Sequence, residues 1–243
     1  MSESLLQVKG LGKRFGGFVA LSDIDLTVNN GERIGLIGPN GSGKSTFVNC
    51  LCGSLRNDQG EVVFAGHKMN GLSAHERIRR GLARSFQLPR PFGTMTLAEN
   101  ILVPILYAAE SKHHVGTTRA RGRCLELLRM VGLQDKADVK PAELTQIEMR
   151  KLELARALAS EPRLLIADEA MAGLTHREVD DILALLMTLN SQGVTIIMIE
   201  HIMRAVLSFS QRLVVLVAGR KIADGAPEEV IRQPDVVAAY LGS

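Results

Sequence analysis

The sequence predicts an α/β fold built on a parallel sheet, with an antiparallel β region near the N-terminus and an inserted helical region. Three observations carry this prediction. A glycine-rich loop at 38–45 lies between a buried apolar run and a helical pattern. Two further apolar runs, at 163–168 and 194–201, are continuous, as is typical of parallel strands covered on both faces. Between residues 87 and 160, helical patterns dominate and β-branched runs are few.

Short alternating stretches at 5–9 and 21–28 predict half-exposed strands, with turns at 16–17 and 29–31. Another short strand is expected at 61–66. The N-terminal quarter is therefore predicted to form antiparallel strands that lead into the glycine-rich loop.

Further along the chain, the apolar run 101–109 is interpreted as a core helix, and 118–131 shows the spacing of a second helix. A helix over 178–189 would join the two buried strands into a βαβ unit. A hairpin is expected over 212–223, and Pro227 opens a last helix, because proline suits the first turn.

Length and composition suit one α/β domain with a subdomain, since the chain has 243 residues and 46% of them are hydrophobic. Aromatic residues make up only 4% and Trp is absent, which argues against an aromatic platform for nucleic acid. The net charge of +3 is mild. The densest basic stretch holds Arg77, Arg79, Arg80 and Arg84. We interpret it as a solvated helix face; contact with a membrane surface or a partner is the alternative.

The three cysteines, Cys50, Cys52 and Cys124, lack the spacing of metal ligands. Buried apolar side chains in a reducing compartment are the better interpretation. The N-terminus has no secretory signal, and no apolar run approaches the roughly 18–20 residues of a membrane span. We therefore expect a soluble chain, which is compatible with docking on a membrane protein.

The glycine-rich loop fits the phosphate-binding pattern Gly-x4-Gly-Lys-Ser without a mismatch. Its glycines let successive backbone N–H groups turn inward toward an anion, and the following helix adds positive potential. Lys44 can reach the β- and γ-phosphates, and Ser45 offers a hydroxyl to Mg2+. ATP and Mg2+ are therefore the predicted cofactors. The loop residues are Gly38, Pro39, Asn40, Gly41, Ser42, Gly43, Lys44 and Ser45, followed by Thr46.

Paired carboxylates at the end of an apolar run form the second signal. Asp168 is placed to hold Mg2+, and Glu169 to polarise an attacking water as general base. His201 follows a buried strand, at the sheet edge where parallel strands deliver ligand-binding groups. Gln87 could ligate Mg2+ weakly through its amide, and Phe15 could stack on adenine. Each of the last three also has an ordinary structural interpretation when taken alone.

With these residues in order, the chain resembles the nucleotide-binding subunit of ATP-binding-cassette (ABC) transporters over essentially all 243 residues. The resemblance implies a P-loop NTPase core of the RecA type, at 1–86 and 161–225, that includes an antiparallel β subdomain. A helical subdomain at 87–160 and a C-terminal helix at 226–243 would complete a single ABC ATPase domain. The implied roles are an adenine-stacking Phe15, Walker A at Gly38–Ser45, a Q-loop Gln87, Walker B ending at Asp168, a catalytic Glu169 and a switch His201.

Several stretches resemble one subfamily, the ATPase subunits of importers for branched-chain amino acids and related solutes, including urea. They lie at 14–17, 85–92, 171–174, 199–201, 225–230 and 239–242. The function implied is ATP hydrolysis coupled to solute import. The partners implied are membrane permeases, a second ATPase subunit and, indirectly, an extracytoplasmic solute-binding protein. The implied location is peripheral, on the cytoplasmic face of the inner membrane.

One departure from the family concerns its signature, Leu-Ser-Gly-Gly-Gln, whose slot at 144–148 reads Leu-Thr-Gln-Ile-Glu. Both glycines are replaced, by Gln146 and Ile147, and a β-branched Ile obstructs close approach and positive φ. In the family, each signature closes over the other subunit's ATP. We therefore favour a heterodimer with a subunit bearing an intact signature, with a homodimer as the alternative. The loop after Glu169 also ends in Thr175, where the family often has Asp.

Three rival functions are weighed against this one. A soluble ABC ATPase acting on nucleic acid or ribosomes usually carries two cassettes or long coiled-coil insertions, which do not fit in 243 residues. A P-loop kinase outside the family would not explain Gln87 and His201 in register. A cassette that binds ATP mainly to close is opposed by the intact Glu169 and favoured somewhat by the altered signature.

Overall fold

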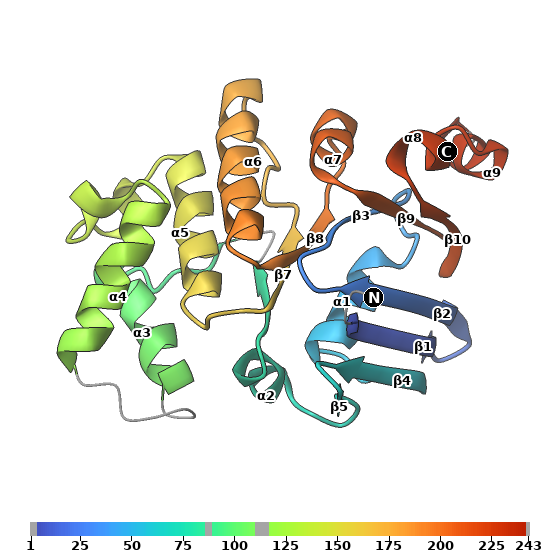
Figure 1. The fold of residues 1–243 in the computed structure, drawn as a ribbon, viewed down its shortest axis with the longest axis horizontal. Helices are drawn as coiled ribbons and strands as arrows, with labels where there is room; N and C mark the ends of the chain where they lie inside the picture. The colour runs from blue at the N-terminus through green and yellow to red at the C-terminus, as the bar shows by residue number, and fades with distance from the viewer. Residues whose placement is uncertain (1–3, 86–88, 110–116, 242–243) are drawn as a thin grey trace.

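The computed structural model describes residues 4–85, 89–109 and 117–241 (Figure 1). Two sheets lie side by side, and a group of helices extends from the edge of the larger one. The strands are β1 (Ser4–Phe15), β2 (Phe18–Asn29), β3 (Arg33–Ile37), β4 (Gln59–Phe64), β5 (His67–Lys68), β6 (Leu82–Ser85), β7 (Leu164–Asp168), β8 (Thr195–Ile199), β9 (Arg212–Val217) and β10 (Arg220–Gly225). The helices are α1 (Lys44–Cys52), α2 (Ala74–Arg79), α3 (Leu97–Ala109), α4 (Thr117–Met130), η1 (Gln134–Lys136), η2 (Pro141–Glu143), α5 (Gln146–Leu158), α6 (His176–Ser191), α7 (Met203–Phe209), α8 (Pro227–Val230) and α9 (Pro234–Leu241).

The smaller sheet is antiparallel, with strand order β2-β1-β4-β5, which confirms the antiparallel N-terminal quarter. The larger sheet has the order β10-β9-β3-β8-β7-β6. Within it β9, β3, β8, β7 and β6 run parallel, and β10 pairs antiparallel with β9. The predicted hairpin and the βαβ unit β7-α6-β8 are thereby confirmed.

The continuous apolar run of β7 reflects its place between two cores. Leu165 and Ala167 pack into the core shared with α5 and α6. Leu164 and Ile166 pack into the core beneath the antiparallel sheet, together with Phe47 of α1. Because both faces of β7 are covered by apolar side chains, the alternation expected of a half-exposed strand is absent.

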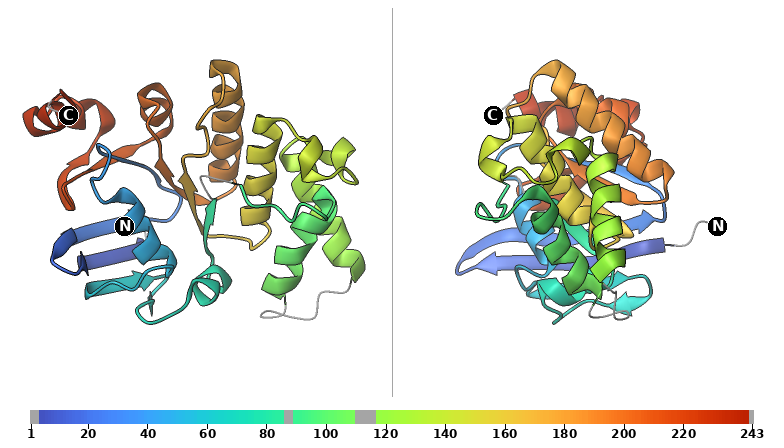
Figure 2. Two further views of the ribbon diagram at one scale, coloured as in Figure 1. Left: turned by 180° about the vertical axis from the view of Figure 1, so that it is seen from behind. Right: turned by 90° about the vertical axis from the view of Figure 1, so that its left-hand side faces the viewer.

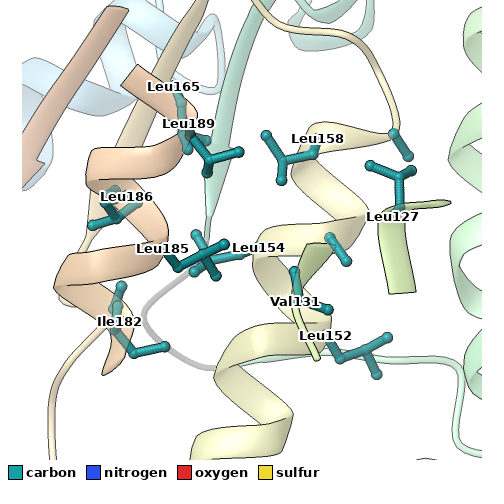
Figure 3. Close-up of a cluster of buried hydrophobic side chains, with 14 of the residues drawn as sticks. Leu127, Val131, Leu152, Leu154, Leu158, Leu165, Ile182, Leu185, Leu186 and Leu189 are labelled. Carbon is teal, nitrogen blue, oxygen red and sulfur yellow. The ribbon is translucent and has the colours of Figure 1, made fainter. Parts of the chain in front are cut away.

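The helical region shares its core with the larger sheet. Figure 3 shows side chains of α4, α5 and α6 meeting in one cluster, in which Leu154 and Leu158 of α5 lie between Leu127 of α4 and Leu189 of α6. Leu165 of β7 belongs to the same cluster. Helix α5 therefore belongs structurally both to the helical region and to the layer that covers the sheet, as the two views of Figure 2 also show.

One expectation about helices is confirmed in part and another is corrected. The run 101–109 is helical, but only one face of α3 belongs to the core: Ile101 and Ile105 are buried, whereas Leu106 and Tyr107 are exposed by 40% and 41%. Residues 226–243 do not form one helix, because α8 ends before Pro234, which opens α9. A proline lacks the N–H that would continue the first helix.

The interpretation of the arginine stretch as a solvated face is wrong for Arg77. Its side chain is only 2% exposed, and its Nη1 donates to the carbonyls of Cys50 and Leu51, each at 2.7 Å. Its Nη2 donates to the carbonyl of Met69 at 2.8 Å. Arg77 thus adds donors to backbone carbonyls at the C-terminal end of α1, where, among the described residues, the carbonyl of Cys50 otherwise accepts only the N–H of Gly53, at 3.4 Å.

Candidate nucleotide site

The phosphate loop joins β3 to α1 and has the backbone that an anion cradle requires. Gly38, Gly41 and Gly43 have φ of 152°, 76° and 101°. A Cβ at Gly38 would collide with the carbonyl oxygen of Leu216, and one at Gly43 would lie 2.9 Å from that of Ala20. No side chain in the described part of the structure caps the first turn of α1, so its N–H groups remain available to a ligand.

Lys44 closes the loop on itself. Its Nζ donates to the carbonyls of Gly38 at 2.7 Å and Pro39 at 3.0 Å, and the side chain is nearly buried. Burial lowers the pKa of Lys44, while the negative charges of Glu169 and Asp168 act in the opposite direction. The ammonium and both predicted carboxylates therefore lie within electrostatic reach of one another, which joins the two sequence motifs into one site.

Asp168 ends β7 and is 6% exposed. Its Oδ2 accepts hydrogen bonds from Nη2 of Arg84 and, at 3.1 Å, from Nε. Arg84 also donates through Nη1 to Oδ1 of Asn49 on α1, at 2.7 Å. Arg84 is therefore part of the site, which corrects its interpretation as solvated surface. Both of these contacts use Oδ2, so neither of these hydrogen bonds from Arg84 occupies Oδ1 of Asp168.

Glu169 and His201 face each other across the ends of β7 and β8. His201 Nε2 lies 2.9 Å from Glu169 Oε1, and the N–H of Glu169 donates to the carbonyl of Ile199 at 2.9 Å. Glu169 has a φ of 48°, a conformation that non-glycine residues rarely adopt and that is concentrated at functional sites. The sequence-predicted pair is thus brought into direct contact, with the imidazole half exposed.

Phe15 ends β1 beside the turn to β2 and is 49% exposed, with the ammonium of Lys13 5.6 Å from its ring centroid. A cavity of about 420 Å³ lies nearby, lined among others by Lys13, Leu21 and Arg220. Leu21 also contacts the phosphate loop at Gly43, so this cavity adjoins the loop. The prediction for Gln87 concerns a position outside the described residues.

The altered signature slot forms the start of α5. Thr145 is the N-cap: its Oγ1 accepts the N–H of Glu148, and Glu148 Oε2 accepts the N–H of Thr145 at 3.0 Å. An ion pair of 2.7 Å with Lys136 and these N-cap bonds hold the pKa of Glu148 below its ordinary value. The hydroxyl of Thr145, at the place of the signature serine, is therefore engaged in a capping box.

The two residues that replace the signature glycines point in different directions. Gln146 donates through Nε2 to the carbonyl of Ala172, at 3.2 Å, and a Cβ at Gly173 would collide with the same amide. Ile147 packs against the core of the helical region. In the loop after Glu169, Thr175 caps α6, because its Oγ1 accepts the N–H of Glu178. An N-cap is a position that Asp and Thr both favour, which gives a physical reason for the exchange.

Sequence reasoning missed two further contacts of the site. Glu200, buried at the end of an apolar run, accepts the N–H of Met171 at 2.8 Å through Oε1. Burial raises the pKa of Tyr240 on α9, while a hydrogen bond from the backbone of Gly38 acts against this rise. The sequence did contain a signal for Glu200, because a charged residue directly follows a buried strand. It contained no signal for the contact of Tyr240, because this contact joins distant parts of the chain.

Comparison with known proteins decides the family. The profile described as ABC transporter matches residues 21–172, and one described as branched-chain amino acid ATP-binding cassette transporter matches residues 220–243. The chain belongs to the ABC transporter family. The high-affinity branched-chain amino acid transport ATP-binding protein BraF of Pseudomonas aeruginosa is 37% identical over 100% of this chain and 99% of its own length. LivG of Escherichia coli K12, which carries the same description, is 35% identical with the same coverage.

Solved structures agree with this assignment. A nucleotide-free ATP-binding cassette from an ABC transporter has a TM-score of 0.89 at 31% identity and covers 99% of this chain and 100% of its own. An ABC cassette in its ADP conformation has a TM-score of 0.89 at 32% identity, with both chains covered completely. The predicted fold class, the family and the assignment as an ATP-binding ATPase are thereby confirmed. Among the described residues, no helix of this ABC subunit is long and apolar enough to cross a membrane.

Proposed function

We propose that this ABC subunit hydrolyses ATP to drive import of branched-chain amino acids or a related small polar solute. The observation that supports the solute class is the match of residues 220–243 to the profile named for branched-chain amino acid cassettes. Full-length identity alone does not select a solute, because a methionine import ATP-binding protein of Rhizobium johnstonii is also 37% identical over 96% of this chain. A urea-type solute is the alternative.

The phosphate end of ATP would lie on the N–H groups of residues 38–46, with the base against Phe15. Lys44, now bonded to Gly38 and Pro39, would turn to the β- and γ-phosphates. Carboxylate and hydroxyl oxygens are ligands that suit Mg2+, so Asp168 Oδ1 and the hydroxyl of Ser45 fit this ion. Gln87 is proposed as a further ligand. Bound Mg2+ would neutralise charge that develops on the transferred phosphate.

Glu169 is proposed as the group that orients and deprotonates the attacking water, and His201 as the group that holds Glu169 in place. Their 2.9 Å contact supports a shared task, since a base must lie within hydrogen-bond reach of the group that orients it. The positive charge of Lys44 and the N-terminus of α1 would stabilise the phosphoryl transition state. Catalysis would thus depend mainly on positioning and charge.

The partners proposed are membrane permeases, which would hold this subunit peripherally at the cytoplasmic face of the inner membrane. A groove of about 250 Å³ between α2, α3 and α5 supports the docking site, because it is lined by Ile78, Phe92, Val103 and Tyr107, each 37–42% exposed. Exposed apolar side chains gathered in one groove suit a protein partner. Solute specificity would come from the permeases and an extracytoplasmic solute-binding protein.

A second ATPase subunit is proposed to complete the nucleotide site, and we favour one that differs from this chain. The N-terminus of α5 supports this, because Gln146 occupies the place of a glycine and contacts Ala172 of its own chain. Glu148 adds a carboxylate at the same helix end, where a partner's γ-phosphate would arrive. The carboxylate of Glu148 and the γ-phosphate would repel each other because both are negative, and the ion pair of Glu148 with Lys136 offsets this repulsion only in part.

The experiment that tests the function is steady-state Mg-ATP hydrolysis by the purified chain over a range of protein concentrations. Glu169→Gln should bind ATP with little change and lose most turnover, whereas Lys44→Ala should lose nucleotide affinity first. Turnover retained in Glu169→Gln removes Glu169 from the role of base. If this chain alone hydrolyses ATP as fast as it does when mixed with the second ATPase subunit, the heterodimer hypothesis is wrong. A burst without steady turnover identifies the alternative, a half of an asymmetric pair that mainly binds ATP.

A further inference from the structure

Glu200 is a buried carboxylate that the hydrolysis mechanism does not use. It is only 3% exposed, although it follows β8 directly and precedes the exposed His201. Its Oε1 accepts the N–H of Met171 at 2.8 Å, and its next neighbour in the chain is His201. A buried charged group is costly unless such bonds satisfy it, so a carboxylate at this place calls for a function.

This bond joins the two segments that carry the proposed catalytic pair. Met171 lies two residues after Glu169, in the turn where the N–H of Ala172 donates to the carbonyl of Glu169 at 3.2 Å. His201 follows Glu200 in the chain and meets Glu169 at 2.9 Å. One carboxylate therefore joins both segments on the far side of the contact between Glu169 and His201.

The other face of the same turn is held by α5. Arg150 donates through Nη2 to the carbonyl of Ala172 at 3.1 Å, and Gln146 donates to the same oxygen. The charges of Glu200 and Glu169 favour the charged form of Arg150, whose pKa burial lowers. In the turn after Glu169, Glu200 thus accepts the N–H of Met171, and two side chains of α5 donate to the carbonyl of Ala172.

We propose that Glu200 is a positioning residue for hydrolysis: by accepting the N–H of Met171, this chain neighbour of His201 fixes the distance between the segments that carry Glu169 and His201. ATP and the attacking water would add new contacts to the side chains of Glu169 and His201. The hydrogen bond of Glu200 comes from a backbone N–H, so it does not depend on the positions of those two side chains. The proposal rests on the proposed roles of Glu169 and His201.

The test compares Glu200→Gln, which keeps an acceptor oxygen, with Glu200→Leu, which has a similar volume and no acceptor. Turnover is read by single-turnover hydrolysis with enzyme in excess over Mg-ATP, and the KM for ATP by steady state. We expect Glu200→Leu to lower the rate of hydrolysis at least tenfold with the KM within twofold, and Glu200→Gln to stay within threefold of the wild type. Hydrogen exchange of the peptide 169–174 should quicken in Glu200→Leu only.

Glu32→Leu is the matched control. Glu32 is a mostly buried carboxylate that accepts a backbone N–H, from Asn29, at the same 2.8 Å, and it lies just before β3 at the opposite end of that strand from the phosphate loop. Its loss should lower stability while the hydrolysis rate stays at the wild-type value. An equal loss of rate in both Leu variants, an unchanged rate in Glu200→Leu, or unchanged exchange of 169–174 in that variant each overturns the proposal.

Glu169→Gln is run in parallel so that the two hypotheses fail separately. If Glu169→Gln retains turnover, the proposed role of Glu169 fails, and with it the purpose assigned to Glu200. If Glu169→Gln loses turnover while Glu200→Leu retains it, only the positioning role of Glu200 is wrong. Hydrogen exchange of the peptide 169–174 is measured on the same variants without nucleotide. It therefore reports the hydrogen bond between Glu200 and Met171 independently of ATP hydrolysis.

Discussion

The buried guanidinium of Arg77 offers the sharpest test of how the phosphate-loop helix is held. We predict that Arg77→Met strongly destabilises the protein, because the substitution keeps much of the side-chain volume and removes every donor. Three short bonds would be lost, to the carbonyls of Cys50, Leu51 and Met69. A weaker contact from Nε to the carbonyl of Leu72, at 3.3 Å, would be lost as well.

The magnitude follows from those bonds. A hydrogen bond from a charged donor contributes about 1.5–3 kcal/mol, so three give an upper limit of roughly 5–9 kcal/mol. Relaxation and entry of water recover part of this, and removal of one partner of a buried charged contact typically costs about 3–5 kcal/mol. We expect a loss in that range. For a chain of this size it corresponds to a fall in Tm of roughly 6–20 °C.

The assay is urea unfolding followed by circular dichroism, because the chain has no Trp and only two Tyr for fluorescence. Arg80→Met is the control: Arg80 is on the surface three residues further along, and its loss should change the free energy of unfolding by less than about 0.5 kcal/mol. A loss below about 1 kcal/mol in Arg77→Met would refute the reasoning that these carbonyls depend on Arg77.

Three further predictions follow from single contacts. Burial raises the pKa of Cys50 to about 11 and that of Cys52 to about 12, so the thiolate needed for reaction is scarce at pH 8. A thiol reagent should label neither in the native protein at pH 8 and label both after unfolding; rapid native labelling would contradict their burial. Thr175→Ala should cost about 1 kcal/mol in urea unfolding through loss of the N-cap of α6, and Thr175→Asp should restore it. Ile147→Gly should cost more than the ~1 kcal/mol that helix propensity alone can account for, because Ile147 also packs on a core; a cost no larger than that propensity would show that this packing is unimportant.

The parts of the fold that could be predicted are those whose cause is local. The phosphate loop is specified within eight consecutive residues, and the buried strands β7 and β8 are marked by their own apolar runs. The contact of Glu169 with His201 was also accessible, since both follow parallel strands and such strands bring their ends to one edge. These predictions needed only short-range patterns and one rule of sheet topology.

The predictions that failed depended on neighbours far away in the chain. Arg77 and Arg84 share one basic stretch, yet Arg77 meets carbonyls 26 and 27 residues earlier, and Arg84 meets Asp168, 84 residues later. Charge spacing along the sequence contains no information about such partners. The exposed face of the helix at 101–109 was missed for a related reason, because its apolar side chains line a groove that we propose for a partner protein.

The start of α5 shows why a motif that departs from its family can still be well ordered. Thr145 and Glu148 form a capping box, so the slot that differs from the signature specifies a stable helix end. Gln146 then uses its amide on the turn that follows Glu169, the same turn that Glu200 holds from the other side. The glutamine that stands at the place of a signature glycine thus forms a hydrogen bond within its own chain. In the proposed mechanism a partner's signature would decide when ATP is enclosed, and the turn that α5 holds would decide where Glu169 lies, so the two roles are consistent with one another.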